Sequence, residues 1–133
     1  MHLLKVSPPQ VFQALSDATR LRVIRLLFGT NQEACLCELV DSLQEPQYKL
    51  SRHLKILRQA GFLDIRKEGR WVYHRLVTQP SYLKTLVKAV GELPDEDNVL
   101  RTDTARFKER LKHRTGGRCR VGILTEELQS EAG

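Results

Sequence analysis

The chain has 133 residues and a formal net charge of +6, with 22 Lys and Arg against 16 Asp and Glu. This length fits one domain of about 100–150 residues, and no apolar run reaches the ~18–20 residues that cross a bilayer. The N-terminus lacks the apolar region of a signal peptide, so we expect a cytoplasmic protein without a membrane partner. In a reducing compartment, the three cysteines do not predict a disulfide framework.

The positive charge is concentrated in one segment of the chain. Between Gln47 and Arg75 there are eight basic residues and two acidic ones, and the other 14 basic and 14 acidic residues cancel. A charge excess confined in this way indicates a single surface that holds a polyanionic partner.

Two helices are predicted at the start of the chain. Pro8 and Pro9 stand where the first turn of a helix tolerates proline, and the apolar spacing that follows predicts a short helix as far as Leu15. Asp17 is the expected N-cap of the second helix, and Gly29 is its expected stop.

A pair of short helices joined by a tight turn is expected next. The apolar residues at positions 36, 39, 40 and 43 predict one helix, which closes at residues 44–46. The other helix runs from Gln47 to about Gln59, and its periodicity predicts that Leu50, Leu54 and Leu57 are buried.

After Gly61 the periodicity changes from helical to alternating. Apolar residues from Phe62 lead to a turn at 67–70, and the aromatic and β-branched stretch 71–77 returns as the second strand of a hairpin. A further helix is expected from Pro80 to near residue 91. The predicted fold class is therefore mainly α with a β-hairpin, arranged as a winged helix-turn-helix.

The sequence divides into three parts. We assign residues 1–92 to a winged helix-turn-helix domain for DNA binding and dimerisation. Residues 93–115 are expected to form a linker and an additional C-terminal helix. Residues 116–133 are expected to be a flexible tail that carries Cys119, apart from a short apolar patch at 121–124.

The order of these elements points to double-stranded DNA as the partner. The second helix of the pair must place polar and basic side chains in the major groove while its leucines face the core, and the hairpin tip can reach phosphates or the minor groove. The candidate DNA-binding residues are Gln47, Tyr48, Lys49, Ser51, Arg52, His53, Lys55, Arg58, Lys67 and Arg70.

Three ordered motifs resemble the ArsR/SmtB family of metal-responsive transcriptional repressors. They are LSDATRLRVIRLL at 15–27, LSRHLKILRQAG at 50–61 and RKEGRWVYHRL at 66–76. The resemblance implies a homodimer that binds a palindromic operator and leaves it when a toxic metal or metalloid binds. It also implies that the dimer pairs the first helix with the helix after the wing, here residues 11–15 and 82–90.

Cys35 and Cys37, at the start of the third predicted helix, resemble the family's Cys-x-Cys thiolate site. A thiol in the first turn feels the positive end of the helix dipole, which lowers its pKa toward the thiolate that soft metals bind. Residues two apart on a regular helix point about 200° apart, so chelation of one ion must distort the first turn. We therefore expect ligand binding to unwind or tilt this helix end and to displace the recognition helix.

The third ligand is left open between two alternatives. In arsenic-responsive members the third thiol lies three residues after the second, where this chain has Val40. Cys119 could complete a three-thiolate site for As(III) or Sb(III), with its flanking arginines favouring the thiolate. Alternatively, Cys35 and Cys37 alone suffice for a monosubstituted trivalent arsenical. We favour As(III) or Sb(III) as the inducer, with Cys119 as third ligand.

Two other kinds of repressor and an enzyme are the alternatives to this function. A thiol redox-sensing repressor would pair Cys35 or Cys37 with Cys119. Cadmium- and lead-sensing members of the family resemble this chain in the cysteine pair but look to earlier cysteines, and none precedes Cys35. We do not expect an enzyme, because Ser51 and His53 diverge on a helix and the sequence has no glycine-rich phosphate loop or paired-carboxylate motif.

Overall fold

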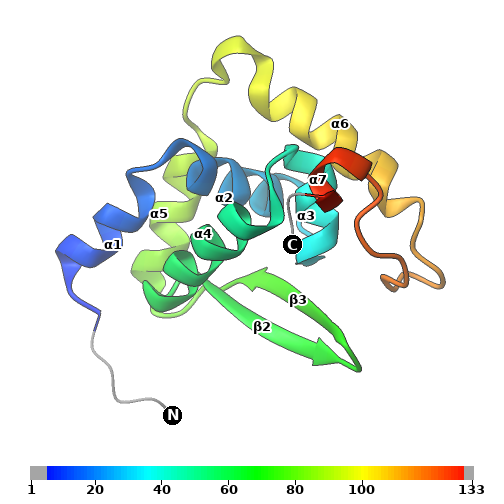
Figure 1. Cartoon of the computed structure of the whole chain (residues 1–133). Coiled ribbons are helices and arrows are strands. Elements are labelled where there is room, and N and C mark those ends of the chain that lie inside the picture. The colour runs from blue at the N-terminus through cyan, green and yellow to red at the C-terminus, as the bar shows by residue number, and fades with distance from the viewer. Residues whose placement is uncertain (1–5, 131–133) are drawn as a thin grey trace.

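The computed structural model describes residues 6–130 (Figure 1). The helices are α1 (Pro8–Leu15), α2 (Ala18–Thr30), α3 (Leu36–Leu43), α4 (Gln47–Gln59), α5 (Ser81–Gly91), the 3-10 helix η1 (Glu96–Asn98), α6 (Val99–Leu111) and α7 (Glu126–Ser130). The strands are β1 (Ala34–Cys35), β2 (Leu63–Glu68) and β3 (Trp71–Leu76). No helix among the described residues is long and apolar enough to span a membrane.

The ends of α2 show how local chemistry sets the helix boundaries. The carboxylate of Asp17 accepts a hydrogen bond from the backbone N–H of Arg20 at 3.0 Å, which confirms Asp17 as the N-cap. The prediction that Gly29 stops the helix is wrong. The helix continues to Thr30 and ends at Asn31, whose left-handed backbone (φ 52°) closes it, because asparagine tolerates that conformation better than most residues.

The predicted pair α3 and α4 is present with the predicted bounds. α3 ends at Leu43, where Gln44 takes up a left-handed backbone, and α4 begins after Pro46. Leu50, Leu54 and Leu57 of α4 are all buried, as their spacing predicts. One face of α4 is therefore fixed on the core, and the opposite face is available to a partner.

The hairpin β2–β3, which we call the wing, is antiparallel, with Leu63 opposite Leu76 and Glu68 opposite Trp71. Its two-residue turn begins at Gly69, whose positive φ of 63° suits glycine. The sequence did not predict β1, which adds a third strand beside β3 and places Cys35 opposite Tyr73. The start of α3 is thereby hydrogen-bonded to the wing.

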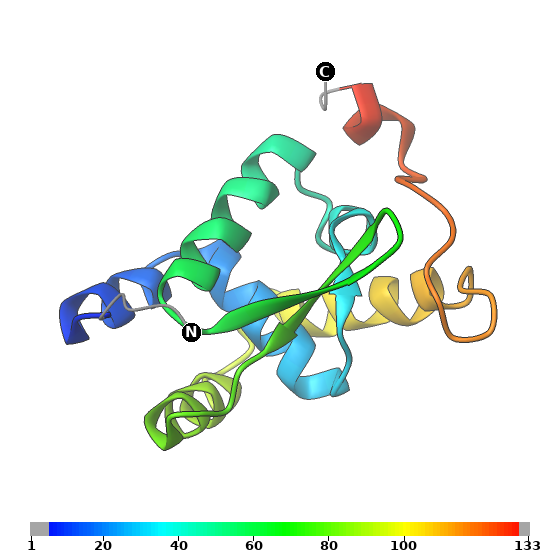
Figure 2. The ribbon, with the colours of Figure 1, turned by 90° about the horizontal axis from the view of Figure 1, so that it is seen from below.

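The C-terminal helix α6 belongs to the same core as the helix-turn-helix. Phe107 of α6 is fully buried in the main apolar cluster. Arg22 of α2 binds both carboxylate oxygens of buried Asp103 at 2.9 Å, which ties α6 to α2. α1 and α5 lie at one side of the molecule and the segment after α6 lies at the other (Figure 1, Figure 2).

The segment after α6, which the sequence predicts to be a flexible tail, lies against the body of the molecule as far as α7. It starts with a tight turn in which Gly116 and Gly117 both have positive φ and Thr115 pairs with Arg118. Cys119 is completely buried. The last part of this predicted tail, residues 131–133, lies outside the described residues, as do residues 1–5 of the predicted N-terminal domain.

Candidate functional site

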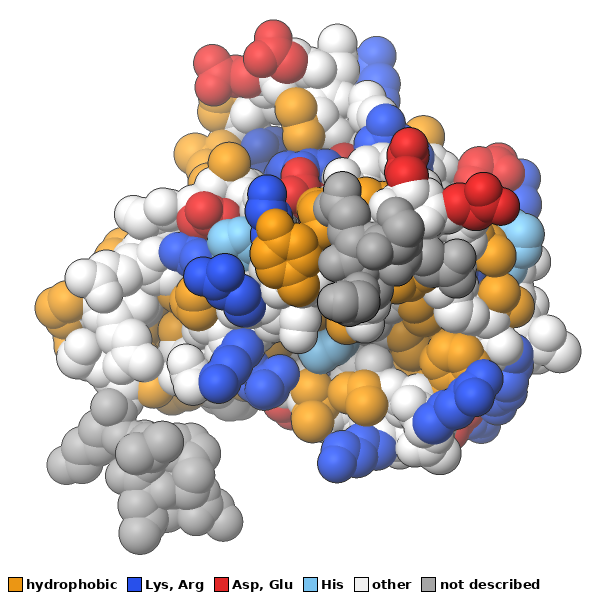
Figure 3. Space-filling model, in the orientation of Figure 1, with side chains coloured by type: hydrophobic (Ala, Val, Ile, Leu, Met, Phe, Trp, Pro, Cys, Tyr) orange, Lys and Arg blue, Asp and Glu red, His pale blue; other side chains and the backbone are white. Residues whose placement is uncertain are grey.

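The exposed face of α4 carries most of the candidate DNA-binding side chains. Those that are exposed are Tyr48, Lys49, Ser51, Arg52, Lys55 and Arg58, and Gln47 is half-buried. Lys and Arg side chains gather over α4 and the wing, whereas the acidic side chains on this face lie mainly in its upper half (Figure 3). The folded chain therefore gathers the sequence's basic segment onto one surface.

His53 lies differently from the other candidates on α4. Its Nδ1 atom is 3.1 Å from a guanidinium nitrogen of Arg20 and 3.6 Å from the carboxylate of Asp17. Arg20 also donates to the backbone carbonyl of Ala14 at 2.7 Å. The imidazole therefore packs α4 against the start of α2, a positioning contact that the sequence did not reveal.

At the wing, the basic side chains divide into two kinds. Lys67 and Arg70 at the tip are exposed, and the Arg70 guanidinium stacks over the Trp71 ring at 4.9 Å. Arg66 instead binds the carboxylate of Glu33 at 2.7 Å, and Arg75 binds that of Asp64 at 2.6 Å. The wing cations that remain candidates for DNA contact are therefore those of the tip.

Cys35 is the N-cap of α3 and has an extended backbone (φ −76°, ψ 157°), while Cys37 lies within the first turn. The expectation that both thiols stand on a regular helix and point apart is therefore wrong. Because Cys35 also ends β1, the chain bends between the two residues.

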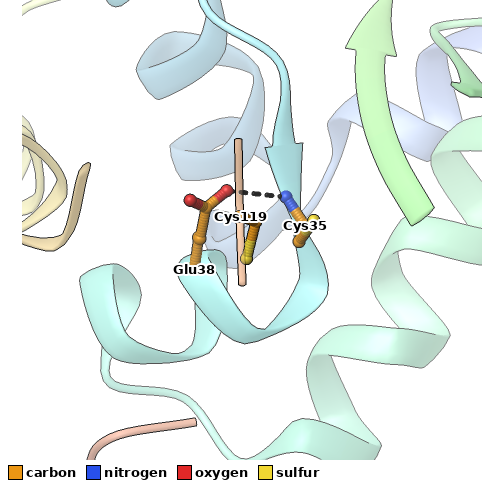
Figure 4. A group of neighbouring side chains, drawn as sticks. All are labelled: Cys35, Glu38 and Cys119. Atoms are coloured by element: carbon orange, nitrogen blue, oxygen red, sulfur yellow. Dashed lines mark hydrogen bonds between the residues drawn. The ribbon is translucent and has the colours of Figure 1, made fainter. Parts of the chain in front are cut away.

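The third thiol joins this pair from a distant part of the sequence. The Cys119 sulfur is 3.6 Å from the Cys37 sulfur. The Cys119 sulfur, the Cys35 sulfur and a Glu38 carboxylate oxygen all lie within 4.8 Å of one another (Figure 4). Among the described residues this is a group whose atoms could hold a metal ion; it contains two of the three predicted thiol ligands, and the third, Cys37, adjoins it through its contact with Cys119.

The three thiols differ in acidity. The contact with the Cys35 thiol lowers the pKa of Cys37 to about 7, and the charge of Arg110 adds to this. The same contact and burial raise the pKa of Cys35, and burial raises the pKa of Cys119 to about 11. We expected the start of the helix to lower the pKa of both thiols. Only the pKa of Cys37 is lowered, and the cause is its contact with the neighbouring thiols and the charge of Arg110.

The arginines beside Cys119 do not favour its thiolate as expected. Both Arg118 and Arg120 turn to the carboxylate of Glu68 on the wing. Cys35 and Cys119 both have raised pKa values and carry their protons at neutral pH. A soft ion binds the deprotonated sulfur, so ligand binding must displace these two protons.

Glu38 lies beside the thiols and holds the backbone of Cys35. Its buried carboxylate accepts the Cys35 backbone N–H at 3.0 Å and binds the guanidinium of Arg114 through two hydrogen bonds, of 2.7 and 2.8 Å. With both oxygens held in this way, Glu38 positions Cys35 and is poorly placed to coordinate an ion itself. Its place three residues after the N-cap is the capping-box signal by which the sequence could have revealed it.

A second buried ion pair holds the Cys119 segment against α3. Arg110 of α6 donates to Asp41 at 2.7 Å and to the carbonyl of Val121 at 2.7 Å. Asp41 also accepts the backbone N–H groups of Leu124 and Thr125 at 3.0 Å. These partners lie far apart in the sequence, so no local motif could have predicted the contact.

This chain is similar in sequence to known bacterial regulators. Residues 17–64 match the family model "Bacterial regulatory protein, arsR family". The chain is 41% identical over 100 residues to the arsenic resistance transcriptional regulator ArsR2 of Pseudomonas putida, covering 72% of this chain and 86% of that protein. It is 46% identical over 69 residues to the arsenical resistance operon repressor of Escherichia coli, covering 52% of this chain and 58% of that protein.

A solved structure agrees with the sequence comparison. HlyU from Vibrio cholerae superposes with a TM-score of 0.55 at 27% identity, covering 62% of this chain and 85% of that one. The predicted winged helix-turn-helix is thus confirmed, and the relatives and the fold are those of DNA-binding regulators and not of enzymes. This chain belongs to the arsR family of bacterial regulatory proteins.

Proposed function

We propose that the protein is a homodimeric transcriptional repressor that leaves its operator when As(III) or Sb(III) binds the thiols of Cys35, Cys37 and Cys119. The observation that carries this proposal is the 3.6 Å contact between the Cys37 and Cys119 sulfurs, with Cys35 in the same cluster. Relatives named for arsenic and arsenical resistance support the choice of ligand.

The DNA-binding part of the proposal rests on α4 and the wing tip. A helix with one face on the core and a polar, basic face outward can enter the major groove, where its side chains read base edges and contact phosphates. The side chains assigned to this contact are Gln47, Tyr48, Lys49, Ser51, Arg52, Lys55 and Arg58 of α4 and Lys67 and Arg70 of the wing. His53 takes the positioning role that its contacts indicate.

The inducer part rests on the chemistry of three convergent sulfurs. Arsenous acid exchanges its three hydroxyl groups for three thiols and releases three water molecules. Soft thiolate ligands favour such ions over hard cations, and the low pKa of Cys37 supplies the first nucleophilic sulfur.

The dimer is proposed from the faces of α1 and α5. Phe12 of α1 is 60% exposed and Tyr82 of α5 is 45% exposed, and both line one apolar groove with Val11 and Leu86. Exposed apolar grooves of this kind mark association surfaces. A second copy of the chain would cover these rings and place two copies of α4 on the two halves of a palindrome.

The proposal is tested by release from DNA. We expect arsenite to release wild-type protein from an operator duplex, and to leave the double variant Cys35→Ser, Cys37→Ser bound with unchanged affinity for DNA. Gel-shift titration measures both. Release of the double variant by arsenite would contradict the thiol site.

The number of ligands is decided by Cys119→Ser. We expect this variant to lose its response to arsenite, whose three positions need three sulfurs. A methylated trivalent arsenical, which has two exchangeable positions, should still bind this variant through Cys35 and Cys37. Thiol counting before and after arsenite should show three blocked cysteines in wild-type protein.

The same sulfur contact favours a second candidate, a redox-sensing repressor. A hydroperoxide would oxidise the Cys37 thiolate to a sulfenic acid, and Cys119 would then condense with it to a disulfide and release water. Release from DNA by hydrogen peroxide without arsenite, reversed by dithiothreitol and absent in Cys119→Ser, would identify this function instead.

A further inference from the structure

Residues 115–120, which we call the arm, contact both α3 and the wing through Cys119 and the two arginines beside it. The arm leaves α6 by a tight turn in which the N–H of Thr115 donates to the carbonyl of Arg118 at 2.9 Å and the reverse bond is 3.1 Å. Gly116 and Gly117 supply the positive φ values that this turn requires. The position of Cys119 is thereby fixed relative to the end of α6.

The arm touches the wing at two places. The backbone N–H of Cys119 donates to the hydroxyl oxygen of Tyr73 at 2.8 Å, and Tyr73 is buried in β3. At the end of β2, the Glu68 carboxylate binds Arg118 and also Arg120, the latter at 3.1 Å. These arginines lie on either side of Cys119, so the wing holds the arm from both sides of the thiol residue.

Cys119 therefore faces two ways. Its backbone is bonded to the wing through Tyr73, and its sulfur touches Cys37 on α3 at 3.6 Å. A ligand that bonds this sulfur therefore acts on a residue whose backbone is held by the wing. The thiol site and the wing thus share one residue.

The charge of Glu68 gives this link a consequence for DNA. Glu68 lies at the end of β2, between Lys67 and the turn that carries Arg70. Arg118 and Arg66 lower the pKa of Glu68 to about 2, so the carboxylate is ionised and its charge is offset by arginines. Without the arm, a less compensated negative charge would stand beside the phosphates that the wing tip contacts, and like charges repel.

We propose that the arm couples the thiol site to the wing, so that ligand binding at Cys119 withdraws Arg118 and Arg120 from Glu68 and weakens the wing's hold on DNA. This inference rests on the proposed function for the identity of the ligand. It replaces the expected route, in which the first turn of α3 unwinds, with a direct contact between the third ligand's segment and a DNA-binding element. Glu68 and Tyr73 are positioning residues in this scheme.

The contact between arm and wing is tested first without any ligand. A double-mutant cycle combines Arg118→Gln, Arg120→Gln with Glu68→Gln, and operator affinity is measured on a duplex that the wild-type protein selects from random sequences. We expect the arginine changes to weaken binding about fivefold or more when Glu68 is present, and to have little effect when Glu68 is replaced by Gln. Additive effects would overturn the proposal.

Asp64→Asn provides the matched control. Asp64 is a wing carboxylate whose ion pair is with Arg75 of the adjacent strand and not with an arginine of the arm. The same cycle run with Asp64→Asn in place of Glu68→Gln should be additive. Coupling of equal size with Asp64→Asn would show that only general surface charge is measured, which overturns the proposal.

The ligand step is tested by repeating the Glu68 cycle with saturating arsenite. We expect the coupling between the arm and Glu68 to vanish when arsenite is bound. Tyr73→Phe loses only the hydroxyl group; it should bind arsenite at least as tightly as wild-type protein, and arsenite should release less of it from DNA. If arsenite releases wild-type protein but leaves the coupling intact, the arm is not the route and the proposal fails. If arsenite neither binds nor releases wild-type protein, the proposed function fails, while the ligand-free cycle still decides the contact.

Discussion

At the scale of single residues, His74 shows what burial does to a titratable group close to the DNA-binding helix. It lies in β3, is 6% exposed, and borders a small cavity with Ser51 and Lys55 of α4. Its Nδ1 atom is buried and has no hydrogen-bond partner among the described residues. Burial and the charge of Arg58 lower the pKa of His74 to about 4, so the ring is neutral at neutral pH.

We expect acid to destabilise the protein through this ring. The unfolded histidine takes up a proton near its ordinary pKa of 6.5, whereas the folded one resists until about pH 4. The free energy of unfolding should therefore fall as the pH drops between these values, by about 3 kcal/mol at pH 4 for this residue alone. Urea unfolding curves measured across this range provide the check.

His74→Gln isolates this effect because glutamine does not titrate. The variant should lose the His74 share of the pH dependence, whereas His113→Gln, which changes an exposed histidine of the same chain, should keep it. An identical pH profile for His74→Gln and wild-type protein would mean that folding does not lower the pKa of this ring, which would contradict the expectation.

At the scale of elements, the proposed DNA contacts come from α4 and from the wing. Local pattern predicted both elements, because three leucines at helical spacing bury one side of α4 and a glycine turn joins two β-prone stretches. Pattern predicted Lys67 and Arg70 at the tip as DNA contacts, but it did not show the physical distinction between these cations and Arg66 and Arg75, which bind carboxylates. That distinction depends on Glu33 and Asp64, which only the fold brings into range.

The wing prediction concerns the salt dependence of operator binding. Removing one phosphate contact makes the slope of log affinity against log salt concentration shallower by about 0.9. We expect Lys67→Ala and Arg70→Ala each to reduce the steepness of the slope by about two such steps, because the proposed homodimer carries each residue twice, and to weaken binding to specific and nonspecific duplexes alike. Fluorescence anisotropy at several salt concentrations measures the slope.

Lys108→Ala is the control for the wing variants, since Lys108 is an exposed cation of α6 outside the proposed interface. Its slope should equal that of wild-type protein. Unchanged slopes for both wing variants would remove Lys67 and Arg70 from the DNA-binding surface.

At the scale of the whole molecule, the apolar groove of α1 and α5 is the feature that a single copy leaves unpaired. Phe12 and Tyr82 are exposed aromatic rings on adjacent helices. Aromatic anchors at the centre of an interface commonly contribute about 2 kcal/mol or more each. The proposed dimer would bury both rings.

We expect Phe12→Lys to weaken the dimer by about 4 kcal/mol, because the ring occurs once in each copy, which is roughly a thousandfold in the dissociation constant. Sedimentation velocity should show monomers at concentrations where wild-type protein is dimeric, and operator binding should weaken because each half-site is then held by a separate molecule. Val99→Lys, at an exposed apolar position of α6, should change neither. A wild-type protein that sediments as a monomer would refute the dimer.

Much of the fold could be predicted from the sequence alone because its signals are local. Helix periodicity, the Asp17 cap and the turn at Gly69 each depend on residues a few positions apart. The cysteine pair and the basic helix were visible for the same reason. Local signals mislead where more than one residue type can end a helix. Asn31 closes α2, although Gly29 was expected to do so.

The tertiary structure decided how the charged surface and the thiols relate. The sequence located the excess of positive charge and named three cysteines, but the contact between Cys37 and Cys119 spans 82 positions. The ion pairs of Glu38 with Arg114 and of Asp41 with Arg110 also join distant segments. Such contacts depend on how helices pack and which buried charges find partners, and a linear pattern carries no information about either.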